Sequence, residues 1–502
     1  MHELSQFGAG LLTALEPANL LYAFLGCVIG TLVGVLPGVG PVAGIAILLP
    51  ITFGMEPSGA LIMLAAIYYG TMYGGTITSV LINVPGESAS VVTAIDGYQM
   101  AQQGKAGQAL SIAALGSFFG GCVATLGIVL LAGPLSQLGL LFGPPEFFTL
   151  ILVGFSLLIG LAGNSISKAI ISAVFGLALT LPGLDPMVGM PRLTFDQISL
   201  MDGFGFVPVL MGLFGISEIL VNIESARKTL VMAPISSLFP GKHELKVSIA
   251  PVLRGTALGF FIGLIPGLGA ATSSFAAYAL ERRVAKDPTR FGKGAIEGVA
   301  GPEAANNATA NASLLPLLAL GIPGSASVAL LMGAFLMNGI TPGPFLFRDH
   351  GDLVWTLIAS MIVGNFILLA LNLPLVGLWT KVLSIPYGVL FALIVVFATI
   401  GSYAINSSMI DVAVMFAFGV VGYVFRKVDI PLAPIALTLV LGPQFEQSLR
   451  QSLVLSNGDI GIFFRGPISI TLVIVAVVSV FLSAWQPVGK AVKMIKEQDT
   501  EV

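Results

Sequence analysis

The sequence predicts an all-α polytopic membrane protein built as an inverted-topology repeat, and three observations lead to this fold class. The 502 residues are 56% hydrophobic and 9% charged, with a mean hydropathy of +0.97, which exceeds what a water-soluble surface tolerates. The basic residues divide unequally between the two sides of the predicted membrane. The two halves of the chain repeat the same motifs in the same order.

Apolar runs of spanning length, separated by short loops, predict about eleven crossings. They lack the alternating pattern of an outer-membrane barrel, so a helical bundle is expected. The predicted crossings are 59–100, 107–133, 145–163, 165–182, 203–223, 295–340, 351–373, 386–402, 409–425, 430–449 and 467–485.

Two further apolar segments, 20–54 and 254–283, are predicted to be re-entrant hairpins. The second begins at Arg254 and ends at Arg283, with Pro-Gly-Leu-Gly in its middle. If each segment returns to the side of the membrane from which it entered, 18 of the 22 Lys and Arg residues are cytoplasmic and four are not. Each arm of the second hairpin would be ~16 Å long, about half of a ~30 Å hydrocarbon core. One long helix kinked at Pro266 is the alternative.

The hairpin motif occurs twice. "GTLVGVLPGVGP" at 30–41 matches "GFFIGLIPGLGA" at 259–270. Downstream, "YGTMYGGTITSVLINVPGESASV" at 69–91 faces "NATANASLLPLLALGIPGSASV" at 307–328, and both contain a Pro-Gly helix break. We therefore expect two hairpins and two broken helices. Opposite orientation of the halves would make the repeat inverted, the plan of many secondary transporters with alternating access.

The predicted topology divides the chain into four parts. A first repeat at 1–223 holds the hairpin 20–54 and the broken helix 59–100. A cytoplasmic linker at 224–249 follows, and then a second repeat at 250–485 with the hairpin 254–283 and the broken helix 295–340. A cytoplasmic tail at 486–502 completes the chain, and the N-terminus is expected in the periplasm.

Non-helical backbone at membrane depth leaves amide and carbonyl groups without intrahelical partners, so the breaks are candidate binding sites. No Lys or Arg lies within them. An anion would bind backbone N–H groups at half-helix N-termini, and a cation would bind carbonyl and amide oxygens. We expect no catalytic residues, no metal centre and no cofactor.

Three acidic residues near the breaks are weighed separately, because buried charge is costly. Glu87 follows the first Pro-Gly break and is predicted either to cap the next half-helix or to take part in the site. Asp96 is expected near the cytoplasmic interface, where it would pair with Lys105. Glu303 is expected to act as a helix-start charge.

The motifs resemble those of the large membrane (permease) subunit of the bacterial tripartite tricarboxylate transporters. The matching stretches are "GTLVGVLPGVGPVAGIAILLP" at 30–50, "YGGTITSVLINVPGESASVVTAIDGYQMAQQGKAG" at 73–107, "FGKGAIEGVAGPEAANNA" at 291–308 and "GIPGSASVALLMGAFLMNGITPGP" at 321–344. The resemblance implies a multi-pass inner-membrane protein that imports citrate-like tricarboxylates or dicarboxylates with an elevator motion. Sodium ion or proton would be the coupling ion. A small four-helix membrane subunit and a periplasmic solute-binding protein would be the partners.

Transferred residue by residue, the resemblance places the substrate site at the tips and breaks. The expected substrate-binding residues are Pro37, Gly38, Val39, Gly40, Asn83, Pro85, Gly86, Ser88, Gly267, Leu268, Gly269, Asn306, Asn307, Pro323, Gly324 and Ser325. The expected cation-binding residues are Thr71, Asn83, Asn307, Thr309 and Asn311.

Other classes of protein fit the sequence less well. A membrane-embedded enzyme would need a nucleophile with a base or a zinc motif, and neither is present. Nucleic-acid binding is not expected, since no basic domain exists. A channel, or a cation/proton exchanger without an organic substrate, remains the alternative.

Overall fold

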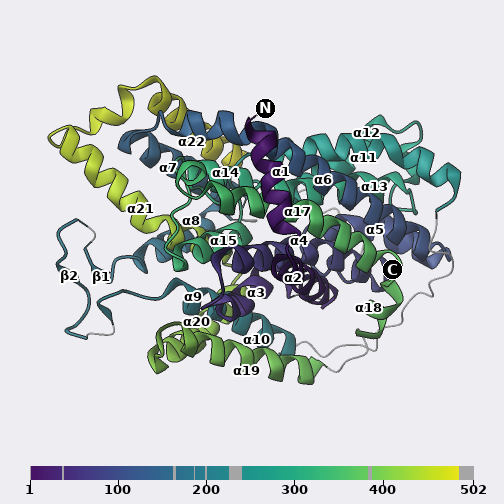
Figure 1. The fold of residues 1–502 in the computed structure, drawn as a ribbon, viewed down its shortest axis with the longest axis horizontal. Helices are drawn as coiled ribbons and strands as arrows, with labels where there is room; N and C mark the ends of the chain where they lie inside the picture. Colours follow the sequence, from purple (N-terminus) through teal and green to yellow (C-terminus); the bar gives the residue numbers. More distant parts are fainter. Residues whose placement is uncertain are drawn as a thin grey trace. The chain divides into compact units, whose positions relative to one another are not determined.

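A computed structural model describes residues 2–36, 39–161, 165–185, 187–197, 200–224, 240–382 and 387–485 (Figure 1). These residues form two compact units. Unit 1 comprises 1–140 and 207–423, and unit 2 comprises 141–206 and 424–502. Each unit therefore takes segments from both of the sequence halves that carry the repeated motifs. The prediction of a cytoplasmic tail at 486–502 lies outside the described residues, as does most of the predicted linker.

The elements of unit 1 are almost entirely helical. From the first half they are α1 (His2–Ala14), α2 (Pro17–Val35), α3 (Gly40–Leu48), α4 (Pro57–Ile82), α5 (Ser90–Gln102), α6 (Ala106–Gly139), α9 (Phe206–Leu210) and α10 (Ser217–Glu224). From the second half they are α11 (Lys242–Gly263), α12 (Ala270–Val284), α13 (Glu297–Ala312), α14 (Leu314–Leu320), α15 (Ala326–Met337), α16 (Leu346–Asp349), α17 (Gly351–Asn372), α18 (Val376–Val382), α19 (Tyr387–Asn406) and α20 (Met409–Lys427). A π-helical turn at Met211–Ile216 joins α9 to α10.

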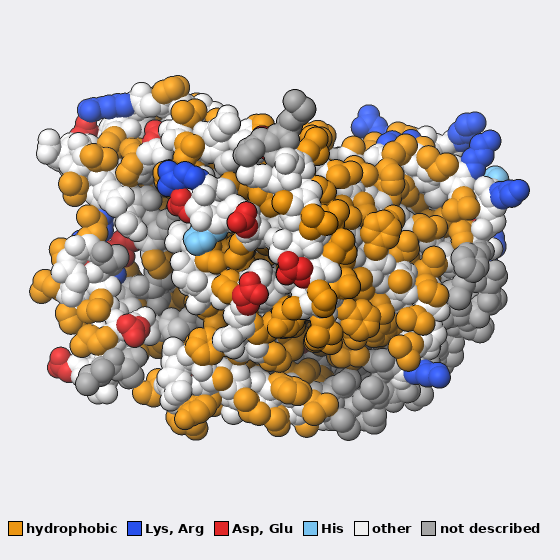
Figure 2. All heavy atoms as spheres, viewed as in Figure 1, with side chains coloured by type: hydrophobic (Ala, Val, Ile, Leu, Met, Phe, Trp, Pro, Cys, Tyr) orange, Lys and Arg blue, Asp and Glu red, His pale blue; other side chains and the backbone are white. Residues whose placement is uncertain are grey.

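Seven described helices are long and apolar enough to cross a membrane, which makes the chain a multi-pass membrane protein. The candidate spans are Pro17–Val35, Pro57–Ile82, Ala106–Gly139, Phe206–Glu224, Lys242–Gly263, Gly351–Asn372 and Met409–Lys427. The exposed face of α6 carries Val123, Leu126 and Leu130, spaced so that they share one side of the helix. Figure 2 shows a largely hydrophobic surface over α6 and α17, as expected of lipid-facing helices.

The hairpin prediction for 254–283 is confirmed as a reversal of the chain. α11 ends at Gly263, and α12 begins at Ala270 and runs back along α11 and α13 (Figure 1). The Arg254 guanidinium donates two hydrogen bonds to the Glu281 carboxylate, at 2.8 and 2.6 Å. This ion pair joins the middle of α11 to the last turn of α12, so one long kinked helix is excluded.

The predicted start of this hairpin was too late. α11 begins at Lys242, inside the predicted linker, and its 22 residues correspond to ~33 Å rather than the expected ~16 Å. Its first turns carry Lys242, His243, Glu244 and Lys246, which lower the hydropathy of the segment without breaking a helix. The two arms are therefore unequal in length.

The reversal predicts a result for cysteine labelling. In a variant lacking Cys27 and Cys122, a single cysteine replacing Lys246 and another replacing Lys286 should label from the same side with an impermeant maleimide. Both positions are exposed, at the outer ends of α11 and α12. Labelling from opposite sides would contradict the hairpin, and labelling of both from the periplasmic side would contradict its predicted orientation.

The first hairpin has the same construction. α2 and α3 are separated by a short connection whose Pro37 and Gly38 lie outside the described residues. The chain folds back after this connection. The close approach of the two arms shows this, since a Cβ at Gly44 of α3 would lie 2.6 Å from Val33 of α2. The two arms thus contact each other as well as α4.

The two broken helices are interrupted where the sequence predicted. Seven non-helical residues, 83–89, separate α4 from α5. Residues 321–325 separate α14 from α15. Both broken helices lie in the core of unit 1, and the membrane-spanning window of α4 is completely buried.

Glycine residues repeat the same helix crossing in both halves. In α2, a Cβ at Gly26, Gly30 or Gly34 would lie within 2.6 Å of the carbonyl oxygen of Met63, Ile67 or Thr71, respectively, in α4. In α11, a Cβ at Gly255, Gly259 or Gly263 would lie within 2.9 Å of the carbonyl oxygen of Gly301, Ala305 or Thr309 in α13. Glycines four residues apart let two backbones approach closely in membranes. Each hairpin is therefore fixed to its broken helix by an equivalent set of three contacts.

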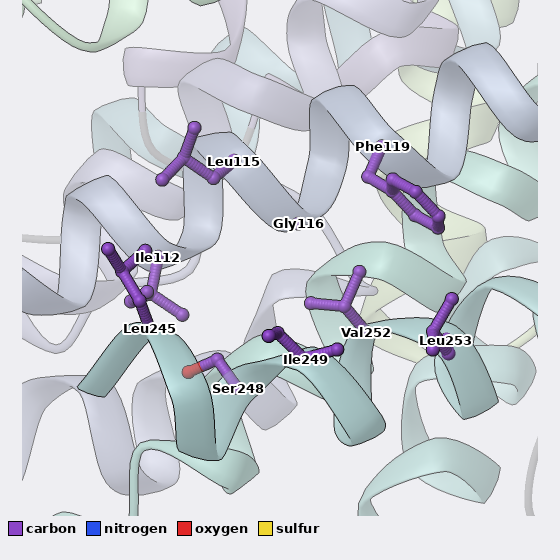
Figure 3. A pocket seen from close by; sticks show the side chains of 9 residues that line it. All are labelled: Ile112, Leu115, Gly116, Phe119, Leu245, Ser248, Ile249, Val252 and Leu253. Carbon is purple, nitrogen blue, oxygen red and sulfur yellow. The ribbon is translucent and has the colours of Figure 1, made fainter. Parts of the chain in front are cut away.

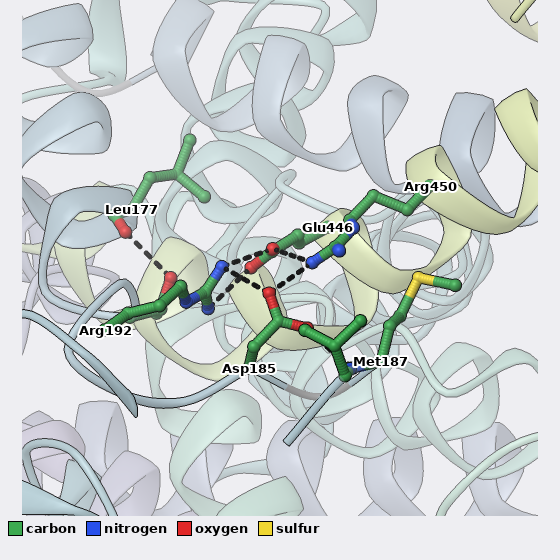
Figure 4. A network of polar contacts seen from close by, with 8 residues as sticks. Leu177, Asp185, Met187, Arg192, Glu446 and Arg450 are labelled. Carbon is green, nitrogen blue, oxygen red and sulfur yellow. Dashed lines mark hydrogen bonds and ion pairs between the residues drawn. The ribbon is translucent and has the colours of Figure 1, made fainter. Parts of the chain in front are cut away.

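Unit 2 comprises α7 (Pro144–Leu161), α8 (Ile166–Ala178), α21 (Ala433–Leu455) and α22 (Pro467–Trp485), with the antiparallel strands β1 (Gly183–Leu184) and β2 (Pro191–Arg192). Figure 4 shows a charged network that joins the strands to α21. Arg450 donates to Asp185 at 2.6 Å and to Glu446 at 3.1 Å, and Arg192 donates to Glu446 at 2.6 Å. Arg192 and Arg450, both predicted on the far side of the membrane, thus share one cluster.

Asp185 makes the stability of unit 2 depend on pH. The hydrogen bond from Arg450 and those from the backbone amides of Met187 and Val188 lower the pKa of Asp185 from 3.8 to about 2. Since the folded-state pKa is lowered, this stabilisation is complete above pH ~4 and is lost as the pH falls toward ~2. We expect Asp185→Asn to lower the midpoint of thermal unfolding near neutral pH, and the difference from wild type to vanish near pH 2. Asp202→Asn, at an exposed position of the same unit, is the control. A difference that persisted at pH 2 would contradict this assignment.

Candidate substrate and ion site

The first helix break exposes polar groups within an otherwise buried helix. α4 ends at Asn83, which has a left-handed backbone (φ 55°), and the side chains of Asn83 and Ser88 are exposed. Gly86 is buried, and a Cβ there would lie 2.0 Å from the carbonyl oxygen of Gly34 and 2.6 Å from Cα of Gly75. Only glycine therefore fits where the break meets the first hairpin. Pro85 is half-buried beside it.

The second break contains buried residues and one residue that is only half-buried. α14 ends at Gly321 with φ 72°, and Pro323 and Gly324 are buried. Ser325 is half-buried, and its hydroxyl accepts a hydrogen bond from the amide of Val328, which caps α15. Ser325 is one of the predicted substrate-binding residues, and in the structure its hydroxyl caps α15.

The second hairpin tip touches the second break directly. The amide of Gly267 donates to the carbonyl oxygen of Gly324 at 3.0 Å. Gly267 has φ 89°, a conformation that favours glycine. Leu268 and Gly269 are half-buried next to it, and Gly269 precedes the first turn of α12. In the first tip, Val39 and Gly40 are half-buried in the same way at the start of α3.

The two breaks are connected through buried side chains. Glu87 accepts a hydrogen bond from the amide of Ala89, the residue directly before α5, at 2.6 Å. This contact is compatible with both of the roles that the sequence left open for Glu87. The other carboxylate oxygen of Glu87 accepts from Nδ2 of Asn306 at 3.2 Å, so Glu87 also contacts the second broken helix. Tyr68, on α4, lies beside Ser325 of the second break. The break residues of the two halves thus form one polar region.

The polar region is suited to an anion by its backbone rather than by basic side chains. Helices α3, α5, α12 and α15 all begin at a tip or a break, and a helix N-terminus carries a partial positive charge. Exposed Asn83 and Ser88 and half-buried Ser325 supply side-chain donors. Carboxylates bind readily at such N-termini.

The side chains of the expected cation-binding residues have different hydrogen-bond partners. The hydroxyl of Thr71 donates to Ile67 O in its own helix, and that of Thr309 donates to Gly259 O of α11. Asn311 donates to Gly121 O and to Thr125 of α6. Asn83 lies apart at the exposed break. Asn307 belongs to a different group of side chains, described next.

Glu303 does not act as a helix-start charge, contrary to the sequence prediction. It lies in the middle of α13 and is 1% exposed. One carboxylate oxygen accepts a hydrogen bond from Thr93, and the other accepts from Thr76 at 2.8 Å and from Ser117 at 3.2 Å. Nδ2 of Asn307 donates to the Ser117 hydroxyl at 2.7 Å. α13 begins at Glu297, six residues before Glu303, and continues through Pro302, which lies inside the helix.

Asp96 does not pair with Lys105 at the interface. It is fully buried and accepts hydrogen bonds at 2.8–2.9 Å from the amides of Gly292, Gly294 and Ala295 and from the hydroxyl of Tyr278. These bonds fix the loop before α13 to α5. Three backbone amides of the glycine-rich loop "FGKGA" donate to one carboxylate oxygen of Asp96. Asp96 therefore has backbone partners in place of the predicted Lys105.

A separate groove between α6 and α11 has a different chemistry (Figure 3). Its volume is about 190 Å³, and it is lined by Ile112, Leu115, Gly116, Phe119, Leu245, Ser248, Ile249, Val252 and Leu253. The hydroxyl of Ser248, the one polar side chain in this lining, donates to Glu244 O in its own helix. The groove therefore offers no donor for a carboxylate.

Fold and site together define the class: a multi-pass helical membrane protein whose core contains helix breaks and hairpin tips. The family model of the tripartite tricarboxylate transporter TctA family matches residues 20–437, and the chain belongs to this family. The resemblance inferred from the motifs is thereby confirmed. Members of the family are the large subunits of tripartite systems that also contain a small membrane subunit and a periplasmic binding protein.

Two relatives come from Agrobacterium vitis. One is described as an uncharacterized 52.8 kDa protein in the TAR-I ttuC′ 3′ region, and it is 48% identical over 502 residues, covering 99% of this chain and 100% of the relative. The other, described as an uncharacterized protein in the TAR-II ttuC′ 3′ region, is 48% identical over 225 residues, covering 45% of this chain and 93% of the relative. No solved structure matches the chain.

Proposed function

We propose that this chain imports citrate-like tricarboxylates or dicarboxylates across the bacterial inner membrane, driven by a sodium or proton gradient. It acts as the large subunit, with a four-helix small subunit beside it and a periplasmic binding protein delivering the solute. Membership of the TctA family supports this assignment. The substrate binds at the tips and breaks, including the residues of the first tip outside the described part of the chain.

The observation that carries the proposal is that a helix N-terminus lies at each break and that buried side chains connect the two broken helices. α5 and α15 each begin at a Pro-Gly interruption, and the two breaks contact the same region through Glu87, Asn306 and Tyr68. A carboxylate bound there gains backbone donors without needing a buried lysine or arginine, whose charge would be costly in the empty site. Release is therefore not hindered by a strong ion pair.

Alternating access follows from the repeat. The two halves form an inverted-topology repeat, with the first hairpin open to the periplasm and the second to the cytoplasm. The equivalent glycine contacts of α2 on α4 and of α11 on α13 support internal equivalence of the halves. The unit that carries both tips moves as an elevator and exposes the same site to either side.

Reconstitution into proteoliposomes tests this function. The chain is combined with its small subunit, the purified binding protein is added, and uptake of labelled citrate and succinate is measured with and without an inward sodium or proton gradient. We expect uptake that requires the binding protein and one of the gradients. Exchange of cations without uptake of any carboxylate would instead identify a cation/proton exchanger and would overturn the proposal.

A further inference from the structure

A small polar cavity lies beside Glu303, inside the core of unit 1. Its volume is about 10 Å³, on the order of one water molecule. Thr76 and Tyr73 of α4, Ser117 of α6 and Asn372 of α17 supply its polar lining. Four oxygen-bearing side chains from three helices therefore surround a space large enough for one small occupant.

The hydrogens of these hydroxyl groups are already directed elsewhere. Thr76 and Ser117 each donate to a carboxylate oxygen of Glu303, at 2.8 and 3.2 Å. The Tyr73 hydroxyl donates to Oδ1 of Asn365 at 3.2 Å. A hydroxyl whose hydrogen points at another acceptor has only lone pairs to offer on its remaining side. The polar part of the lining therefore presents acceptors to the cavity, and Ile77, Leu110, Ala113 and Ala114 form the rest.

Two amide oxygens in the same region have no hydrogen-bond partner. Oδ1 of Asn372, a residue that is 5% exposed and lines the cavity, is one of them. Oδ1 of Asn307, which is 1% exposed and contacts Ser117 through its Nδ2, is the other. Buried acceptors without a donor are uncommon in proteins, and an ordered water molecule or a cation satisfies them.

The Glu303 carboxylate is not balanced by a basic side chain. Within the described chain, no Lys, Arg or His forms an ion pair with Glu303, and its contacts are with hydroxyl groups. Two other buried acids of this unit, Glu87 and Asp96, are bound to Asn306 and to the loop before α13, respectively. A buried carboxylate without a counter-charge is costly at membrane depth, so a cation bound close to it would lower the free energy of the folded state.

We propose that a sodium ion binds in this cavity, with the hydroxyl oxygens of Thr76 and Ser117 as ligands and Glu303 as the balancing charge one hydrogen bond away. Oδ1 of Asn372 completes the set from α17. Hard cations take oxygen ligands of these kinds. The small volume favours Na⁺ over the larger K⁺. This site names the coupling ion of the proposed function and rests on that function for its role in transport.

The same geometry connects the ion to the substrate region. Asn307 contacts the cavity through Ser117, and the adjacent Asn306 contacts Glu87, which binds the Ala89 amide at the first break. Displacement of either side chain alters the position of its neighbour on α13. Sodium binding and carboxylate binding therefore share one helical segment, which provides the reciprocal coupling that a symporter needs.

Direct binding of radioactive sodium tests the site without any carboxylate. The purified full-length chain in detergent is assayed by scintillation proximity, with competition by Na⁺ or K⁺. We expect wild-type binding that Na⁺ displaces at least tenfold better than K⁺. Glu303→Gln should abolish binding, and Thr76→Val should weaken it at least tenfold. Thr78→Val, a buried threonine of α4 whose hydroxyl donates to Gly75 O in its own helix, should bind like wild type.

Each result decides the proposal. No sodium binding by the wild type, or undiminished binding by Glu303→Gln, overturns it. If Glu303→Gln fails to fold by size-exclusion chromatography, Thr76→Val compared with Thr78→Val gives the answer, and equal binding by those two variants overturns the site. Sodium binding that depends on Glu303, together with absent carboxylate uptake, would reject the proposed function and retain the ion site.

Discussion

Carboxylate uptake should be abolished by Gly267→Val, while insertion of the chain into the membrane stays nearly normal. Gly267 combines φ 89° with an amide hydrogen bond to Gly324 O across the second tip and break. A β-branched side chain at positive φ costs about 1–3 kcal/mol, so the tip leaves this conformation and its contact with the break is lost. Uptake in proteoliposomes, normalised to the amount of reconstituted protein, measures the effect.

Gly104→Val is the matched control for backbone strain. Gly104 has φ 76° in the turn after α5, and a Cβ there would meet no atom within 4 Å. The control should keep uptake within about twofold of wild type, since it carries a similar strain away from the tips. Wild-type uptake by Gly267→Val would refute the role of the second tip, and equal loss in both variants would attribute the effect to general strain.

Loss of folded protein is the expected result of Gly30→Ala and of Gly259→Ala. In these variants the added Cβ would lie 2.6 Å from Ile67 O and 2.3 Å from Ala305 O, respectively, and the obstruction in both cases is helix backbone. Overpacking of this kind costs about 1–3 kcal/mol, because the helices must separate. Yield of monodisperse protein and thermal unfolding in detergent provide the measurement.

Gly8→Ala is the control for this pair, because a Cβ at Gly8 of α1 would meet no atom within 4 Å. Alanine in that helix should be neutral or slightly stabilising. The two tested glycines occupy equivalent positions of the repeated motif, so both substitutions should destabilise the protein. Destabilisation by one and tolerance of the other would contradict the equivalence of the two hairpins.

The sequence predicted those features that depend on the local chain. Pro-Gly pairs interrupt helices wherever they occur, so both breaks and the reversal at 266–269 were found at the expected positions. The repeated motifs also contain Gly30, Gly34, Gly259 and Gly263, but their contacts with α4 and α13 were found only in the structure. The position of Glu87 directly after a break indicated that it would lie near the start of α5, where its carboxylate accepts a hydrogen bond from the Ala89 amide.

Features that depend on contacts between distant segments were missed. Glu303 is surrounded by residues from α4, α5 and α6, about 190–230 positions away in the chain. Asp96 meets a loop that follows the second hairpin, again far along the sequence. The polar run "PEAANNATANA" was the available indication, since a fully buried helix of this composition must satisfy its amides and carboxylate by tertiary contacts.

A density map of the purified chain with bound citrate tests the central claim most directly. The account predicts solute density at the N-termini of α5 and α15, in contact with the exposed or half-buried side chains of Ser88 and Ser325 and with the second tip at Gly267–Gly269. Density in the apolar groove between α6 and α11, with uninterrupted protein packing at the breaks, would contradict it.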